Sequence, residues 1–361
     1  MKGRVVVAMS GGVDSSVAAA LLKEQGYEVI GMTMCFNLGD SAGKRPICCG
    51  LQGIEDARRV AHKLDIRHYV VNMKKSLEEK VIKDFCHEYL HGRTPNPCIR
   101  CNQFLKFDIL LKKALALDAK YLATGHYVKV ACAKTYNLQP TTFLLKKAKD
   151  KFKDQSYFLY RLGQNQLKNI LFPLGNYTKL EVRALSKKFD ISVADKPGSQ
   201  EICFLPDNDY RAFLRKRHIS GIKPGNVIDN GGKVLGRHTG IAYYTIGQRE
   251  GLGIAAAHPL YITKLDVQKN EITVGRKEDA CSRGFLLKDL HYIWQPIKKR
   301  VVAGVKIRYN HKEALAEIIP FKNRLKVRFR QPQFAVTAGQ SAVFYDKDNV
   351  LGGGIIERVI E

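Results

Sequence analysis

The sequence has no apolar run near the roughly 18 residues that a bilayer-spanning helix needs, so we expect no transmembrane helix and no membrane partner. The N-terminal residues also lack the long apolar core and the cleavage site of a secretory signal peptide. Cysteine is sparse, with nine in 361 residues, which is too few for a disulfide-stapled scaffold. We therefore expect a cytoplasmic protein whose thiols are reduced, catalytic or metal-binding.

Acidic residues are in short supply. The 60 Lys and Arg residues outnumber 34 Asp and Glu, which gives a formal net charge of +26. Such an excess favours a polyanionic partner, either nucleic acid or an anionic surface. The chain is 45% hydrophobic and 26% charged, which is typical of a globular protein. Its length predicts two or three domains.

Strand-like and helix-like segments alternate along the first half. The residues of 4–9 (RVVVAM) form a continuous apolar run bounded by glycines, which is typical of a buried parallel strand. Further strands are expected at 28–34, 67–71 and 121–124, and helices at 17–23, 54–64, 80–89 and 107–117. This alternation predicts an α/β fold with a doubly wound parallel sheet, here placed in residues 1–205.

After about residue 205 the composition changes to frequent glycine turns with short β-rich runs between them. Residues 206–278 are expected to form a small β-rich central domain, with strands at 260–266 and 271–274. Residues 279–361 are expected to form a C-terminal β-barrel, with strands at 301–309, 315–319, 325–329, 341–345 and 351–356.

The first apolar strand runs directly into Ser10-Gly11-Gly12-Val13-Asp14-Ser15-Ser16 and then into a helix. Gly11 and Gly12 allow positive φ angles and a close approach of the backbone to an oxyanion. Successive N–H groups, the helix N-terminus and the serine hydroxyls would then hold a phosphate group. Asp14 is unusual beside phosphate unless it holds Mg²⁺ or caps the loop. The pattern differs from the lysine-containing phosphate loop of many nucleotidases, and it resembles the PP-loop of the ATP pyrophosphatases.

A C-x-x-C pair, Cys98 and Cys101, lies in the segment RTPNPCIRCN, just before a helix expected to start near Phe104. A thiol near a helix N-terminus with Arg100 alongside is expected to have a lowered pKa and to be partly thiolate. Cys203, in GSQEICFLP, is a second thiol that could be approached. One alternative for the first pair is zinc, because His87 and His91 lie four residues apart on an expected helix, and another is a redox dithiol.

The remaining cysteines carry no chemical assignment. Cys48 and Cys49 are left unassigned, and four others are interpreted as small core or surface residues: Cys35, Cys86, Cys132 and Cys281.

Six motifs occur in order across essentially the whole chain: SGGVDSS, GRTPNPCIRCN, ATGHY, KDQSYFL, GSQEICF and YTIGQREGLG. Together they resemble the tRNA-specific 2-thiouridylase family, which converts the uridine at the tRNA wobble position 34 to 2-thiouridine. The resemblance implies that ATP adenylates the C2 oxygen of this uridine and that sulfur from a cysteine persulfide replaces it. It also implies ATP and Mg²⁺ as cofactors, the tRNA anticodon loop as substrate, and a cysteine desulfurase or sulfur-relay protein as sulfur donor.

Residue by residue, the resemblance assigns Cys101 as the nucleophile and Cys203 as the cysteine that bears the persulfide. ATP would be bound by residues of the first loop and two others: Ala8, Met9, Ser10, Gly11, Gly12, Val13, Asp14, Ser15, Met34 and Gly125. The base and the tRNA would be contacted by Asn96, Pro97, Cys98, His126, Lys153, Asp154, Gln155, Arg308, Tyr309 and Gln340.

The chain departs from the family pattern at Cys98, where many members carry an aspartate thought to act on the base. The role of that aspartate does not transfer to a thiol. An alternative is that Cys98, Cys101 and Cys203 ligate an iron–sulfur cluster. Two further alternatives for the whole chain are another PP-loop adenylating enzyme and a zinc-stabilised RNA-binding protein without enzymatic activity.

Charge patterning supports a nucleic-acid partner. Arg324, Lys326, Arg328 and Arg330 alternate with Leu325, Val327 and Phe329. In a strand, this alternation puts four cations on one face and three apolar side chains on the other. The run that contains Lys306 and Arg308 repeats the pattern beside Tyr309, and residues 146–153 form another basic run.

Overall fold

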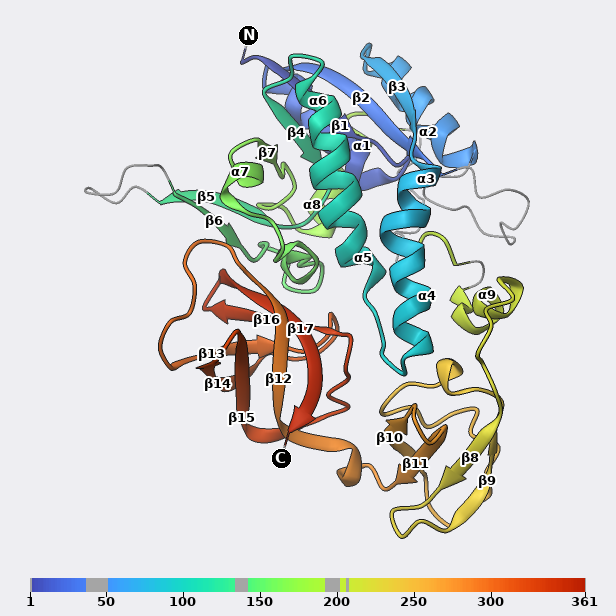
Figure 1. Cartoon of the computed structure of the whole chain (residues 1–361). Helices are drawn as coiled ribbons and strands as arrows, with labels where there is room; N and C mark the ends of the chain where they lie inside the picture. Colours follow the sequence, from blue (N-terminus) through green and yellow to red (C-terminus); the bar gives the residue numbers. More distant parts are fainter. Residues whose placement is uncertain (1, 37–50, 134–141, 192–201, 206–207, 361) are drawn as a thin grey trace. The chain divides into compact units, whose positions relative to one another are not determined.

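The computed structural model describes residues 2–36, 51–133, 142–191, 202–205 and 208–360 (Figure 1). Cys48, Cys49 and the first residues of the GSQEICF motif lie outside these ranges. The chain divides into two compact units, which are described separately. The first unit comprises residues 1–81, 98–208 and 348–350, and the second comprises 82–97, 209–347 and 351–361.

The first unit is built on a five-stranded parallel sheet with the order β3-β2-β1-β4-β7. Its strands are β1 (Arg4–Ala8), β2 (Glu28–Cys35), β3 (Arg67–Asn72), β4 (Tyr121–Thr124) and β7 (Ile170–Leu171). Val5, Val6 and Val7 are fully buried, as expected of a strand covered on both faces. The predicted parallel α/β sheet is confirmed.

The strand order reverses once in this sheet. From β1 the chain proceeds to β2 and β3 on one side, and β4 then adds on the other side of β1. The reversal lies between β1 and β4, and ligands of open α/β sheets generally bind beyond the carboxyl ends of the strands at such a switch point. Residues 10–16, here called the phosphate loop, follow β1, and Gly125 and His126 follow β4. Both segments therefore leave the sheet at this edge.

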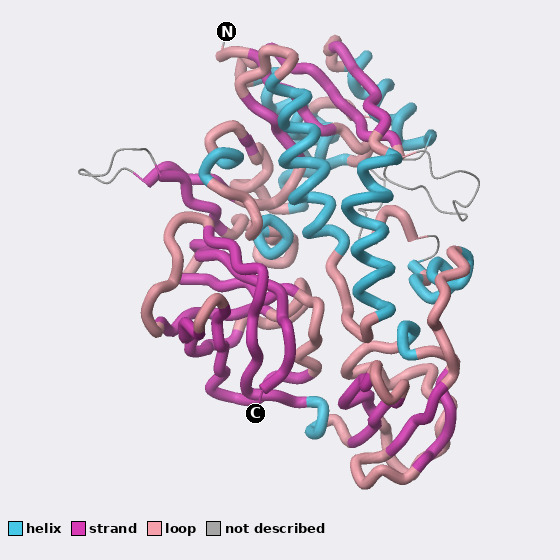
Figure 2. Tube along the Cα trace, viewed as in Figure 1, coloured by secondary structure: helices cyan, strands magenta, loops and turns pink. Residues whose placement is uncertain are grey.

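Helices surround the sheet of the first unit (Figure 2). They are α1 (Val13–Glu24), α2 (Leu51–Lys63), α3 (Lys74–Leu77), η2 (Glu78–Ile82), η3 (Cys101–Leu110), α6 (Leu111–Leu115), η4 (Ser156–Leu159), α7 (Gln164–Leu167) and α8 (Lys179–Lys188).

The hairpin of β5 (Lys129–Ala133) and β6 (Thr142–Lys146) was not expected from the sequence. A capping box starts α8, since the Thr178 side chain accepts the Glu181 N–H and the Glu181 carboxylate accepts the Thr178 N–H.

The second unit contains α4 (Lys83–Leu90), α9 (Tyr210–Lys216) and two β structures. A small sheet has the order β10-β11-β8-β9, from β8 (Gly225–Ile228), β9 (Val234–His238), β10 (Tyr261–Asp266) and β11 (Glu271–Gly275). A six-stranded barrel comprises β12 (Cys281–Tyr292), β13 (Val301–Lys306), β14 (Ala314–Phe321), β15 (Arg324–Phe334), β16 (Ser341–Asp346) and β17 (Asn349–Ile360), and pairing of β12 with β17 closes it. The β-rich centre and the C-terminal barrel are thus confirmed, although β8, β9 and β12 were not predicted.

The cationic strand alternates as expected. Leu325, Val327 and Phe329 of β15 are at most 2% exposed and belong to the barrel core, whereas Arg328 and Arg330 are exposed. One of the four cations is already neutralised, however, because the Arg324 guanidinium forms a bidentate salt bridge with the Glu357 carboxylate at 2.5 and 2.8 Å.

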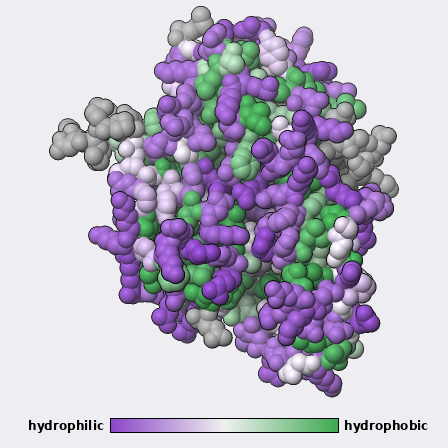
Figure 3. Space-filling view, viewed as in Figure 1, coloured by the Kyte–Doolittle hydropathy of each residue, from purple (hydrophilic) through white to green (hydrophobic). Residues whose placement is uncertain are grey.

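Hydrophilic side chains cover most of the face drawn in Figure 3, with smaller apolar areas between them. None of the helices in the described ranges combines the length and the apolarity that a membrane span requires.

We predict that Leu325→Ala lowers the free energy of unfolding by about 2–5 kcal/mol, because it removes a buried side chain and leaves a cavity in the barrel. The adjacent Lys326→Ala, whose side chain points away from the core, serves as the matched control and should change it by about 0.5 kcal/mol or less. Urea denaturation of both variants measures the difference. Equal effects of the two substitutions would contradict the register of β15.

Candidate functional site: a phosphate loop, a buried thiol and the segment before it

The serine hydroxyls hold the phosphate loop in shape. Ser15 Oγ accepts the Ser10 N–H at 3.1 Å and donates to the Gly12 carbonyl at 3.1 Å. Ser16 Oγ donates to the same carbonyl at 2.9 Å. These two hydroxyls, which the sequence suggested as phosphate donors, are therefore engaged with the loop's own backbone. The N–H groups at the start of α1 are left to face an anion.

Two glycines are required where they stand. Gly11 has φ +73°, and a Cβ at this position would lie 2.3 Å from the Gly53 carbonyl oxygen. A Cβ at Gly125 would lie 2.7 Å from the Ser15 nitrogen. Glycine at both positions lets α2 and the end of β4 approach the loop. The structure thus brings Gly125 next to residues 14 and 15, while Met34 lies buried in β2, two residues beyond the Met32 carbonyl that accepts the Met9 N–H.

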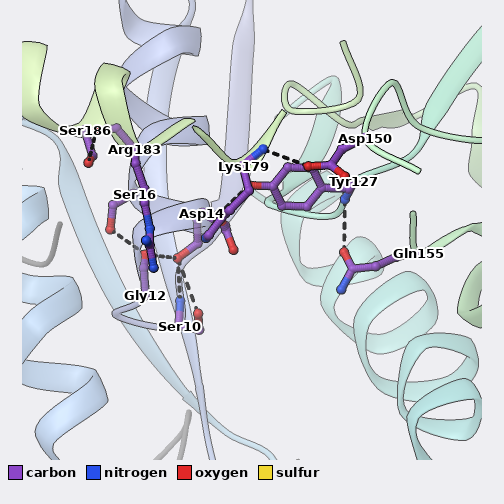
Figure 4. A network of polar contacts seen from close by, with 11 residues as sticks. Ser10, Gly12, Asp14, Ser16, Tyr127, Asp150, Gln155, Lys179, Arg183 and Ser186 are labelled. Atoms are coloured by element: carbon purple, nitrogen blue, oxygen red, sulfur yellow. Dashed lines mark hydrogen bonds and ion pairs between the residues drawn. The ribbon is translucent and has the colours of Figure 1, made fainter. Parts of the chain in front are cut away.

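Asp14 does not cap the loop. Its carboxylate accepts the Tyr127 hydroxyl at 2.8 Å and forms an ion pair with Lys179 at 2.5 Å (Figure 4). Burial, followed by the nearby Asp14 charge, raises the pKa of Tyr127 far above its usual value, so its hydroxyl stays a donor. Sequence reasoning missed Tyr127 and Lys179. The available signals were the ATGHY motif, which contains Tyr127, and the capping box that fixes Lys179 at the start of α8.

The loop at 148–156, which carries three predicted tRNA-contacting residues, is held by two aspartates. Asp150 accepts the N–H groups of residues 152, 153 and 179 at 3.0, 3.1 and 2.9 Å. Asp154 is 9% exposed and accepts the Ala148 N–H at 2.9 Å and the Ser156 hydroxyl at 2.7 Å, so it shapes this loop from inside. Lys153 follows the turn that Asp150 closes, and its side chain is half-buried.

Gln155 and His126 flank Tyr127 in different ways. The Gln155 N–H donates to the Tyr127 carbonyl at 2.9 Å, and the Tyr127 N–H donates to the Gln155 side-chain oxygen at 3.0 Å. His126 Nδ1 lies 2.7 Å from Thr124 Oγ1, and its ring packs near Phe107 and Phe172. Burial, together with the Lys106 charge, lowers the pKa of His126 well below its usual range, so the ring is neutral.

Cys101 lies in a different environment from the one we expected. The helix begins at Pro97 with α5 (Pro97–Arg100), not near Phe104, so Cys98 is in the first turn and Cys101 in the next. Cys101 is 8% exposed, and desolvation raises the pKa of its thiol, although Lys106 opposes the shift. The expectation of a lowered pKa is wrong for this structure, because burial outweighs the helix terminus. From Cys101 to Leu110 the helix is π-wound, a form that often marks functional sites.

The second cysteine, Cys203, is half-buried and precedes the buried Phe204 and Leu205. Within the described ranges, the structure contains no disulfide among the cysteines, which are Cys35, Cys86, Cys98, Cys101, Cys132, Cys203 and Cys281. The partnership of Cys101 and Cys203 stays a prediction.

In the second unit, one residue assigned to the tRNA contacts the segment that carries residues assigned to the base. Gln340 Nε2 donates to the carbonyls of Thr94 and Pro95 at 3.0 and 3.2 Å, which holds the extended loop that leads into Asn96 and Pro97. Arg308 donates to the carbonyls of Phe334 and Ala335 at 3.2 Å. Lys306 Nζ lies 5.6 Å from the centre of the Tyr309 ring.

Neither metal hypothesis finds a site in the part of the chain that the structure describes, where no three His, Cys, Asp or Glu side chains are grouped to hold an ion. His87 and His91 stack on each other with ring centres 4.2 Å apart, and His91 Nδ1 lies 2.8 Å from the His87 carbonyl oxygen. The thiols of Cys98, Cys101 and Cys203 likewise form no such group among the described residues. Asp14, the suggested Mg²⁺ ligand, is paired with Lys179.

The first part of the chain is a parallel sheet with a glycine–serine phosphate loop at its switch point, and a small β domain and a β-barrel follow it. These features define an α/β protein with a phosphate-binding loop and two appended β domains. Three family models match nearly the whole chain. They are described as tRNA methyl transferase HUP domain (residues 3–207), tRNA methyl transferase PRC-barrel domain (211–276) and Aminomethyltransferase beta-barrel domain (282–356).

Curated relatives give the family its chemistry. The chain is 50% identical over 365 residues to tRNA-specific 2-thiouridylase MnmA 1 of Caldanaerobacter subterraneus subsp. tengcongensis, with 100% of this chain and 99% of that protein covered. It is 52% identical over 365 residues to tRNA-specific 2-thiouridylase MnmA of Halothermothrix orenii, with 98% and 99% covered. The chain belongs to the tRNA-specific 2-thiouridylase family.

Among solved structures, the U34-tRNA thiolase NcsA from Methanococcus maripaludis with its 4Fe-4S cluster is 19% identical, with a TM-score of 0.36 over 60% of this chain and 67% of that one. A likeness of this size carries no argument about a cluster in this chain.

We predict that Cys101 is alkylated about tenfold more slowly than Cys132 at pH 8, because the Cys101 thiol is buried and its pKa is raised, whereas Cys132 is exposed. Mass spectrometry of peptides after timed exposure of the folded protein to iodoacetamide measures both rates. Raising the pH should increase the rate at which Cys101 is alkylated, since more of its thiol is then ionised to thiolate. Equal rates at the two cysteines in the folded protein would contradict the burial of Cys101.

Proposed function

We propose that this chain is an ATP-dependent tRNA-uridine 2-sulfurtransferase that replaces the C2 oxygen of the wobble uridine by sulfur. The observation that carries the proposal is the phosphate loop at the switch point between β1 and β4, with Gly125 packed against it. The names of relatives that span the full chain at about half identity support it. Residues Ala8–Ser15, Met34 and Gly125 would contact the nucleotide.

Activation of the base solves a chemical problem, since a carbonyl oxygen is a poor leaving group. In the proposed first step, the uridine C2 oxygen attacks the α-phosphorus of ATP, and the bond to the bridging oxygen of the β-phosphate breaks. Pyrophosphate leaves, and the base carries AMP on O2. Backbone N–H groups of the loop stabilise the negative charge that builds up on the phosphates. Mg²⁺ would arrive with the nucleotide, because the described residues offer it no ready ligand set.

Sulfur delivery follows from the two thiols. Cys203 would receive a sulfane sulfur from a donor, which we propose is a cysteine desulfurase or a sulfur-relay protein. The terminal sulfur of the persulfide then attacks C2 and AMP leaves, after which the Cys101 thiolate attacks Cys203 Sγ and releases the thiocarbonyl. In the other order, Cys101 attacks the persulfide first and sets free hydrosulfide, which attacks C2. Both orders end in a Cys101–Cys203 disulfide that a thiol reductant must reopen.

The base has to leave the anticodon stack to reach such a site. A base in a single-stranded loop is extruded at a cost of at most about a few kcal/mol. Asn96, Pro97 and Cys98 would meet it, and His126, Lys153, Asp154, Gln155, Arg308, Tyr309 and Gln340 would contact the tRNA. The net charge of +26 supports binding that depends on phosphate contacts and weakens with salt. We also propose a cytoplasmic location, because nine cysteines in 361 residues are too few for a disulfide-stapled scaffold.

We predict that Cys101→Ser and Cys203→Ser each abolish formation of 2-thiouridine, while Cys132→Ser, at an exposed position, leaves it unchanged. A hydroxyl at either position forms neither the persulfide nor the disulfide, which is the physical reason for the loss. The measurement is mass spectrometry of nucleosides from tRNA incubated with protein, ATP, Mg²⁺ and a persulfide source.

Full activity of either variant would overturn the role assigned to that cysteine. ATP–pyrophosphate exchange that proceeds without any dependence of product on Cys203 would favour a different PP-loop adenylating enzyme.

A further inference from the structure

A carboxylate inside a phosphate loop is an electrostatic problem. Asp14 lies between Val13 and Ser15, at the start of α1, where the N–H groups of the loop would receive the polyphosphate of ATP. Its side chain is 32% exposed, so solvent screens it only in part. An uncompensated negative charge at this point would repel the phosphates. Some other group has to neutralise it.

The neutralising group comes from α8. Lys179 is the first residue of this helix, and its side chain is 17% exposed, with Nζ 2.5 Å from Asp14 Oδ1. Its position is fixed twice over: Asp150 accepts the Lys179 backbone N–H at 2.9 Å, and the Thr178–Glu181 capping box sets the start of the helix. A lysine held in this way has few alternative positions, so the pair is preorganised before any ligand arrives.

A second ion pair joins the same two helices at their other ends and makes the comparison informative. Lys188, near the end of α8, lies 3.0 Å from Glu24, the last residue of α1. Both pairs join a lysine of α8 to an acid of α1, but only Lys179–Asp14 lies at the phosphate loop. If lysine–acid pairs served only to fasten α8 to α1, the two would be equivalent.

Tyr127 is the third partner and extends the arrangement. Its hydroxyl donates to the same oxygen of Asp14 that Lys179 pairs with, and its raised pKa keeps the proton on it. Its backbone is joined to Gln155 by the two hydrogen bonds described above, and Asp150 links the neighbouring turn to Lys179. The loop at 148–156, which carries proposed tRNA contacts, is thus joined to the Asp14 carboxylate of the phosphate loop (Figure 4).

We propose that Lys179 is a positioning residue for ATP: with Tyr127 it holds and neutralises Asp14, so that the phosphate loop accepts a polyphosphate. The proposal rests on the placement of ATP at residues 8–15 in the proposed function. Lys179 acts through Asp14 and not through contact with the nucleotide. Removal of the lysine exposes a repulsive charge, and removal of both charges removes the repulsion.

The test is ATP binding to the full chain, measured by titration calorimetry in the presence of Mg²⁺. Three variants are compared with the wild type: Lys179→Met, Lys188→Met, and a double variant that combines Asp14→Asn and Lys179→Met. Lys179→Met should weaken ATP binding about tenfold or more, as expected for an uncompensated charge a few ångströms from phosphate. Lys188→Met, the matched control, should leave it within about twofold. The double variant should regain an affinity within about threefold of the wild type, and the KM for tRNA should stay unchanged throughout.

Either of two results with the lysine variants would overturn the proposal, and a third variant provides a further test. A double variant as weak as Lys179→Met would mean that the lysine contacts the nucleotide itself, and an equal loss in Lys188→Met would mean that the pair only fastens the two helices. If Lys179→Met does not fold, Tyr127→Phe provides the second variant, which removes one partner of Asp14 and should weaken ATP binding by about two- to fivefold. No loss of ATP affinity in Tyr127→Phe would then overturn the proposal.

A separate arm tests the placement of ATP. A Cβ at Gly12 would meet nothing closer than Ser10 Oγ at 3.5 Å, so Gly12→Ala should fold normally while its methyl group crowds the phosphate. If Gly12→Ala binds ATP as the wild type does, the nucleotide lies elsewhere and the proposed function fails at this point. If Gly12→Ala binds weakly and the lysine variants bind normally, only the role of Lys179 fails.

Discussion

The structure depends on one constraint: the carboxyl end of a buried strand must turn directly into a helix while leaving its N–H groups free. Three fully buried valines fix β1 at the centre of the sheet, and glycine at position 11 is the residue type that both tolerates φ +73° and clears the Gly53 carbonyl. Because β4 is the other neighbour of β1, its own glycine, Gly125, reaches the same turn. The phosphate loop, the Asp14 network and the proposed nucleotide site follow from this single turn.

A reactive thiol and a buried thiol make opposite demands. Attack on sulfur needs thiolate, yet desolvation keeps Cys101 protonated in the free protein. Lys106 is a cation that opposes this rise in the pKa without cancelling it. Burial and a raised pKa both slow the oxidation and the alkylation of a thiol, so Cys101 is shielded in this structure.

Sequence patterns predicted the strands of the parallel sheet well, because a run such as 4–9 is apolar throughout and glycines bound it. They predicted the turn from strand to helix for the same local reason, although Ser15 and Ser16 bond to the loop's own backbone and Asp14 pairs with Lys179. What they missed is long-range: Lys179 is 165 positions from Asp14, and nothing in the local pattern of either residue indicates the other. The thiol of Cys101 was misjudged because its burial depends on tertiary packing, while the helix terminus and Arg100 are visible in the sequence. The strand β12 was missed because Gly284 and charged residues interrupt its alternation.

The most direct measurement of the central claim follows the oxygen atom. With ¹⁸O at C2 of the wobble uridine, turnover with ATP and a persulfide source should yield AMP that carries one ¹⁸O in its phosphate, in equal amount to the 2-thiouridine formed. This result is required if the nucleotide on the loop activates the base by taking up its oxygen. AMP without the label, or ADP and phosphate in place of AMP and pyrophosphate, would contradict the account.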